Sequence, residues 1–186
     1  MNPDLRRKLE TFLLPLYQDL DGVSRFDDVE RIGRIARFLY ESEGDDAFEL
    51  LLLFHGLGKW LERVGNASRT VLAVGGITEA DLWRTTASIR RLDHPESAAE
   101  RAVAGAILID SAGVRGLALK FASARREGHS LLDVVREELA SAWIPDWLPE
   151  RARPWLERRF EAKRRVCREV LDELSLDDYV RSTPAR

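Results

Sequence analysis

Apolar residues recur at helical spacing along most of the chain. The first such face follows Pro3 and Asp4, so it predicts a helix with a proline near its first turn. A second face begins after the Asp21-Gly22 break and ends near Gly44, which predicts a second helix. The first face comprises Leu5, Leu9, Phe12, Leu13 and Leu16, and the second comprises Val29, Ile32, Ile35, Ala36 and Leu39.

A nearly continuous apolar run lies between Asp45 and His55. Asp45 and Asp46 mark the start of a third helix, and the run leaves this helix without a polar face. We therefore expect it to be buried on most sides. Gly56 and Gly58 loosen its end.

Capping signals mark the later helices. Thr78 is followed by Asp81 at the third helical position, as in a capping box. Pro95 suits the first turn of a helix that leads to Asp110, and Ser130 is placed to cap the helix after that.

No segment alternates at strand spacing for long enough to predict a sheet. An aromatic connector at residues 143–149 precedes a long charged helix at residues 150–174. We therefore predict an all-α, single-domain helical bundle of about eight to nine helices. Within it, residues 1–20 form an N-terminal helix packed on the domain of residues 21–174, and residues 175–186 form a C-terminal tail.

Composition sets the outer limits on function. Of the 186 residues, 45% are hydrophobic and 33% are charged, which is enough apolar material for one core. The sequence shows neither a membrane-spanning apolar run nor a signal peptide, so we expect a cytoplasmic protein and no membrane partner. The single cysteine, Cys167, excludes an internal disulfide and a cysteine-built zinc site. A formal net charge of −3 argues against nucleic acid as a partner.

Residues 52–60 read Leu-Leu-Phe-His-Gly-Leu-Gly-Lys-Trp. This segment resembles the signature of the HD-domain metal-dependent phosphohydrolases, in which a leucine-rich helix runs into His-Asp-x-Gly-Lys. His55 and Lys59 match the signature, whereas Gly56 stands where the family has its aspartate. The resemblance spans roughly residues 21–174 and implies an HD-like helical fold.

Other positions can be compared with the same family. Asp28 stands where the first family helix carries a histidine, and Asp110 matches the last ligand in a glycine-rich segment. Sliding the alignment by one step would place Arg115 at that ligand position, but the first register needs no gap through Gly128. His94, in a His-Pro step, matches a position found in many small bacterial members.

The resemblance implies a metal site with a reduced set of ligands. HD enzymes surround a divalent metal with imidazoles and carboxylates, and the aspartate of the His-Asp pair bridges a second metal where one is present. With Gly56 in that place, a two-metal site is not expected. Asp28, His55 and Asp110 would form a residual set for a single Mn²⁺, Fe²⁺ or Mg²⁺ ion.

Structural roles stay open for the same three residues. Asp28 can cap a helix or face water. His55 can be hydrogen-bonded to a backbone carbonyl or to Asp110, and Asp110 can pair with Arg115 or with an arginine from the helix before it. An eroded metal site and a weak surviving one look alike at the level of sequence.

The candidate phosphate- or ligand-binding residues are basic. By resemblance, Lys59 reaches a substrate phosphate and His94 can donate to one, which makes these two the candidate catalytic residues. Arg90, Arg91 and Arg115 could add positive charge around the same cleft. Each of the five also suits an ordinary surface role, solvated or in an ion pair.

Three functions follow from the resemblance. The favoured one is a degenerate HD-domain protein, a pseudoenzyme that lacks two-metal phosphohydrolase activity and binds a nucleotide, a phosphorylated small molecule or another protein. The first alternative is a metal-dependent phosphohydrolase that acts on a nucleotide or phosphomonoester with one residual metal. The second is a structural or oligomerisation module, in which Trp143 and Trp147 bury the surface of a homodimer mate or another protein.

Overall fold

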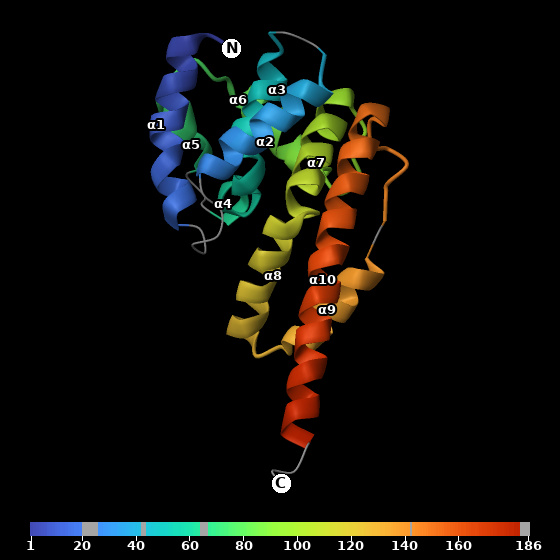
Figure 1. Ribbon diagram of the computed structural model, residues 1–186. Coiled ribbons are helices and arrows are strands. Elements are labelled where there is room, and N and C mark those ends of the chain that lie inside the picture. The colour runs from blue at the N-terminus through green and yellow to red at the C-terminus, as the bar shows by residue number, and fades with distance from the viewer. Residues whose placement is uncertain (20–25, 42–43, 64–66, 142, 183–186) are drawn as a thin grey trace. The chain divides into compact units, whose positions relative to one another are not determined.

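The protein is described by a computed structural model that covers residues 1–19, 26–41, 44–63, 67–141 and 143–182 (Figure 1). These residues contain helices and no strand, so the predicted all-α class is confirmed. The predicted boundary between residues 20 and 21 lies outside the described residues. The helices are α1 (Pro3–Asp19), α2 (Phe26–Leu39), α3 (Asp46–Phe54), η1 (His55–Leu57), α4 (Gly58–Arg63), α5 (Ala67–Ala73), α6 (Glu79–Arg90), α7 (Ala98–Ser111), α8 (Val114–Glu127), α9 (Leu131–Ala140), η2 (Glu150–Ala152) and α10 (Arg153–Ser182).

The chain divides into two compact units. Unit 1 is Met1–Ile107 and unit 2 is Leu108–Arg186. The boundary falls inside α7, so this helix begins in one unit and ends in the other. The apolar pattern of the sequence gives no sign of such a boundary, because the helical periodicity continues across it.

Helix α3 supplies the centre of the unit 1 core. It packs against α1, α2 and α6, and every residue from Leu50 to Phe54 is buried, as the unbroken apolar run predicts. From α1, Leu9, Leu13 and Tyr17 enter the same core. The Tyr17 ring meets Phe26 of α2 edge to face, with the ring centroids 5.9 Å apart.

Side-chain caps fix where several helices of unit 1 begin. The Asp45 carboxylate accepts hydrogen bonds from the backbone N–H groups of Ala47 and Phe48 at the start of α3. Thr78 and Asp81 form the predicted capping box of α6. Ser130 does occupy the N-cap position of α9, but its side chain makes no capping hydrogen bond.

Unit 2 is built on α8, α9 and α10, which pack against one another. Leu117, Val135 and Cys167, one residue from each helix, form its buried apolar cluster. The ammonium of Lys163 lies 2.7 Å from the Glu138 carboxylate, and each side chain is less than one-twentieth exposed. A charged pair is thus enclosed beside a small apolar core.

The last helix is longer than its apolar pattern predicts. Helix α10 continues past Leu174 to Ser182, through most of the segment expected as a tail, and residues 183–186 lie outside the described residues. The connector at 143–149 is not helical, as predicted. In the described part of the chain no single helix is long and apolar enough to cross a membrane, although α7 and α8, taken together across their bend, meet the same length and composition test.

Candidate functional site

His55 lies at the point where the buried helix α3 gives way to the short turn η1. Its Nδ1 atom is 2.7 Å from the carbonyl oxygen of Leu52. Because a carbonyl only accepts, Nδ1 carries the hydrogen of this bond and Nε2 is the nitrogen able to accept or to coordinate. This hydrogen bond is compatible with a purely structural histidine and also with a histidine that is oriented as a metal ligand.

A close contact with Tyr17 of α1 leaves no room for a side chain at Gly56. A Cβ atom at position 56 would lie 2.8 Å from a ring carbon of Tyr17, closer than real Cβ contacts allow. The Tyr17 hydroxyl donates to the Leu53 carbonyl at 2.9 Å and accepts from the Gly56 N–H at 3.2 Å. Burial raises the pKa of Tyr17 far above its ordinary value, against a smaller lowering by the Gly56 N–H. The phenol ring therefore fills the space in which an aspartate side chain would begin.

Asp28 sits in the first turn of α2, where a carboxylate is favoured by the helix dipole. Arg31, one turn further along, donates to Asp28 at 2.8 Å. The pair is partly exposed on both sides. The structural role open to Asp28, an ordinary helix-start carboxylate, thus has a partner in place.

Asp110 lies near the C-terminal end of α7 and is almost fully buried. A carboxylate there faces the negative end of the helix dipole, and the Arg115 guanidinium offsets this with a hydrogen bond of 2.8 Å. The turn that brings Arg115 back is tight: a Cβ at Gly116 would lie 1.7 Å from the Ser111 carbonyl oxygen. The pairing of Asp110 with Arg115, one of the two roles that the sequence left open, is confirmed.

The residues present do not fit a two-metal centre. Gly56 offers no ligand, and the Tyr17 ring occupies its surroundings. Asp28 and His55 belong to unit 1 and Asp110 to unit 2. Across the described residues, no group of three or more His, Cys, Asp and Glu side chains is gathered in a way that could hold a metal ion. The single-metal set of Asp28, His55 and Asp110 stays a prediction.

No protein-family model, curated protein or solved structure matches this chain at a significant level. The likeness to HD domains is therefore carried only by the motif residues, chiefly His55, the Gly58-Lys59 step and Asp110.

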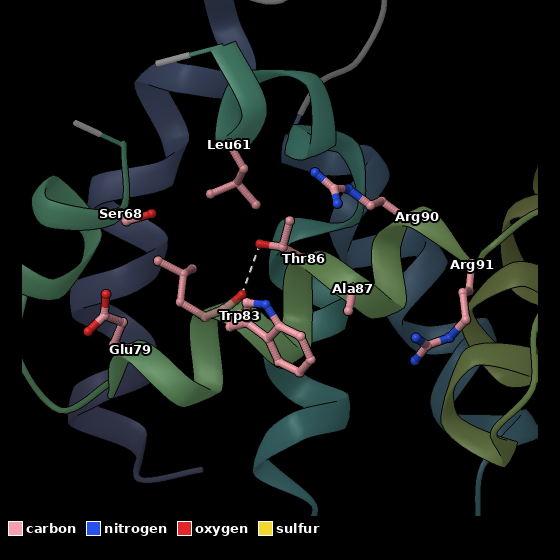
Figure 2. A pocket seen from close by; sticks show the side chains of 9 residues that line it. Leu61, Ser68, Glu79, Trp83, Thr86, Ala87, Arg90 and Arg91 are labelled. Atoms are coloured by element: carbon pink, nitrogen blue, oxygen red, sulfur yellow. Dashed lines mark hydrogen bonds between the residues drawn. The ribbon is translucent and has the colours of Figure 1, made fainter. Parts of the chain in front are cut away.

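The basic residues named from the sequence separate into two groups. Lys59 on α4 and His94 in the loop before α7 are exposed, and neither lines a described pocket. Arg90 and Arg91, at the end of α6, both line one pocket of about 520 Å³ in unit 1 (Figure 2). Arg115 is held by Asp110 in unit 2.

Each pocket arginine is held from behind by a carboxylate that does not line the pocket. Arg90 donates through Nε to Glu62 at 2.9 Å. Arg91 donates through Nε and Nη2 to Glu100, a residue only 1% exposed. These pairs orient the guanidinium groups and leave further N–H donors on each.

The pKa of the Glu100 carboxyl lies well below its ordinary value. Burial alone would raise its pKa, but hydrogen bonds from Arg91 and Ser88 and from the backbone N–H groups of Ser97 and Glu96 outweigh burial and lower the pKa to about 2. Ser97 accepts in turn from the Glu100 N–H at 3.1 Å, which completes a capping box for α7. The Ser97-x-x-Glu100 spacing was a sequence signal for this role.

The sequence gives only a weak signal for the role of Trp83 in the groove and none for the contact of Tyr17 with Gly56. Trp83 stands one helical turn before Ala87 and two before Arg90, so these pocket residues share one face of α6. That spacing could have marked the face. Tyr17 contacts Gly56 across 39 residues of chain, and no local pattern indicates such a contact.

Proposed function

We propose that this chain is a degenerate HD-like helical protein that binds a ligand or a partner and lacks two-metal phosphohydrolase activity. One observation carries the proposal: the buried Tyr17 ring lies against Gly56, at the position where the family signature has a bridging aspartate. A bridging carboxylate is needed to hold a second metal and to activate water between the two ions. Restoring it here would require the buried Tyr17 ring to shift.

Ion pairing of the remaining acidic candidates supports the same proposal. Asp28 is engaged by Arg31, and Asp110 by Arg115. A metal ion would have to compete with a guanidinium for each carboxylate. The charges that a metal would neutralise are neutralised by arginine.

Retained hydrolysis with one metal is the second candidate. The hydrogen bond between Nδ1 of His55 and the Leu52 carbonyl is compatible with it, because Nε2 would then be the nitrogen that coordinates the ion. Under this alternative Asp28, His55 and Asp110 hold the ion, and Lys59 and His94 act on a nucleotide or phosphomonoester. An oligomerisation role is the third candidate, and the 67% exposure of Trp143 supports it.

A hydrolysis assay separates the first two candidates. Purified protein would be incubated with p-nitrophenyl phosphate and with a panel of nucleotides, in turn with Mn²⁺, Fe²⁺ and Mg²⁺. We expect the wild-type chain and His55→Ala to release phosphate at the same background rate. The exposed His129→Ala serves as a matched control. Metal-dependent turnover that is lost in His55→Ala and kept in His129→Ala would overturn the proposal.

A further inference from the structure

The pocket of unit 1 is a groove along one face of α6, closed by Leu61 of α4 and Ser68 of α5 (Figure 2). Its volume of about 520 Å³ falls within the range of small-molecule sites, roughly 300 to 1,000 Å³. The face contributes Glu79 at its start and Arg90 at its end. Arg90 lies eleven positions after Glu79, or about 16 Å along the helix at the rise of an α-helix.

Trp83 is the main aromatic surface of this groove. Its side chain is 72% exposed, the highest exposure among the large hydrophobic residues described, although its neighbour Leu82 is buried in the core. In Figure 2 the indole lies along the helix beside Ala87, whose small side chain leaves the groove open at that point. An exposed indole in a groove can stack on a flat ring of a ligand. Stacking also removes part of the indole surface from water.

Two guanidinium groups stand at the far end of the groove, each already paired with a carboxylate: Arg90 with Glu62, and Arg91 with Glu100 and, at 3.6 Å, Glu96. The C-terminal carbonyls of α6 carry partial negative charge, so an anion there depends on the guanidinium groups of Arg90 and Arg91. Glu62 and Glu100, which do not line the groove, accept hydrogen bonds from the guanidinium groups of Arg90 and Arg91. These bonds orient both guanidinium groups in the absence of a ligand. A guanidinium oriented in this way loses less freedom when it binds carboxylate or phosphate oxygens.

We propose that this groove binds a small molecule that combines a flat aromatic ring with a carboxylate or phosphate group. The ring stacks on Trp83 and the anionic oxygens accept hydrogen bonds from Arg90 and Arg91. Glu79 at the opposite end disfavours a second anionic group there, so the ligand carries its charge at one end. The inference rests on the proposed function, in which the chain binds a ligand, and names the chemical class of that ligand.

Calorimetric titration with four probes tests the assignment. The probes are 2-naphthoate and 2-naphthyl phosphate, which carry ring and anion, 2-naphthalenemethanol, which carries the ring alone, and cyclohexanecarboxylate, which carries the anion alone. We expect the two aromatic anions to bind and the other two to bind at least about tenfold more weakly. The difference between the carboxylate and phosphate probes decides which anion the groove prefers.

Two variants and two matched controls locate the binding. Arg90→Gln should weaken 2-naphthoate by about tenfold and leave the alcohol unchanged, and Trp83→Leu should weaken both by about fivefold. Arg84 is a matched control for Arg90, since it is also 65% exposed on α6 but does not line the groove. Trp143, 67% exposed in unit 2, is the control for Trp83. Arg84→Gln and Trp143→Leu should bind as the wild-type chain does.

Three results would overturn the assignment: no heat of binding at millimolar probe, binding unchanged in both groove variants, or equal losses in variants and controls. All four substituted residues are exposed, so loss of folding is not expected, and circular dichroism would verify it. If the probes do not bind but His55→Ala and the wild-type chain show the same background hydrolysis rate, the groove assignment is wrong and the proposed function is still supported. Metal-dependent turnover would remove the proposed function without altering the titrations.

Discussion

Unit 1 keeps at least one member of each of its charged pairs at the groove exposed, whereas in unit 2 Lys163 and Glu138 are both enclosed, with the exposed Lys120 as a second partner of Glu138. Arg90 and Glu62 are both largely exposed at the rim of the groove, and Arg91 reaches from the surface to buried Glu100. Lys163 and Glu138 are both buried between α9 and α10. Unit 1 has the larger apolar core and unit 2 the smaller one.

The difference indicates where binding and where folding specificity reside. Arg90 and Arg91 keep N–H donors beyond those that their carboxylate partners use, so under the proposal these groups can bind a ligand without leaving their partners. A buried ammonium and carboxylate cannot separate without leaving an uncompensated charge. The charged pairs at the groove of unit 1 thus stay partly in water, where the proposed ligand could meet them, whereas Lys163 and Glu138 of unit 2 are enclosed by packing.

Glu138→Gln should give the largest loss of stability. The substitution leaves the ammonium of Lys163 buried beside a neutral amide, and breaking such a pair costs about 3 to 5 kcal/mol. Urea unfolding followed by circular dichroism measures the change. A double variant with Glu138→Leu and Lys163→Met, which removes both charges, should recover most of the loss. A loss below about 1 kcal/mol for Glu138→Gln would mean that the enclosed pair of unit 2 contributes no more to stability than an exposed pair of unit 1.

Gly56→Asp should destabilise unit 1 by about 1 to 3 kcal/mol, because its Cβ would overlap the Tyr17 ring. The same measurement on Gly33→Ala in α2 provides the control. A Cβ there meets only the flexible end of Arg37, so this variant should be neutral or more stable by up to about 1 kcal/mol. Replacing Tyr17 by leucine should reduce the cost of Gly56→Asp. Equal costs in both backgrounds would show that the ring does not exclude the side chain.

Acid should weaken unit 1 through Glu100. Folding lowers the pKa of this carboxyl from 4.5 to about 2, so its contribution is complete above pH 4.5 and is lost as the pH falls toward 2. We expect about 1 to 2 kcal/mol, because the Arg91 partner is partly exposed and screened. Unfolding free energies measured across this range should fall less steeply for Glu100→Gln than for the wild type. Parallel slopes would mean that Glu100 titrates alike in both states.

Glu62→Gln should have the smallest effect, within about 0.5 kcal/mol, since both members of its pair with Arg90 lie in water. Its consequence should appear in binding instead. Without Glu62 behind it, the Arg90 guanidinium is free to turn, and the affinity for 2-naphthoate should fall by a few-fold. Unchanged affinity would show that the guanidinium needs no orienting partner.

Local signals in the sequence predicted the helices well. The Thr78–Asp81 box caps α6 as expected, and α3 begins beside Asp45 where the sequence placed its start, since such signals depend on only a few neighbouring residues. The unbroken apolar run of α3 correctly indicated its burial. The boundary inside α7 could not be predicted, because helical periodicity does not show that the two ends of one helix pack in different units.

The candidate site was less accessible to sequence reasoning. The pairing of Asp110 with Arg115 was foreseeable, as the two lie five residues apart across a tight turn. The contact of Tyr17 with Gly56 was not, because it joins two helices 39 residues apart. Nor does the sequence tell that Glu62 and Glu100 hold the groove arginines, since ion pairs between helices depend on packing.

Metal content tests the central claim most directly. The purified chain, His55→Ala and His129→Ala would each be incubated with Mn²⁺, Fe²⁺ or Mg²⁺, freed of unbound ion, and analysed for metal per chain. We predict far less than one ion per chain, with no difference among the three proteins, because Tyr17 fills the site of the missing aspartate and arginines hold the other carboxylates. Close to one ion per chain, lost only in His55→Ala, would contradict this account.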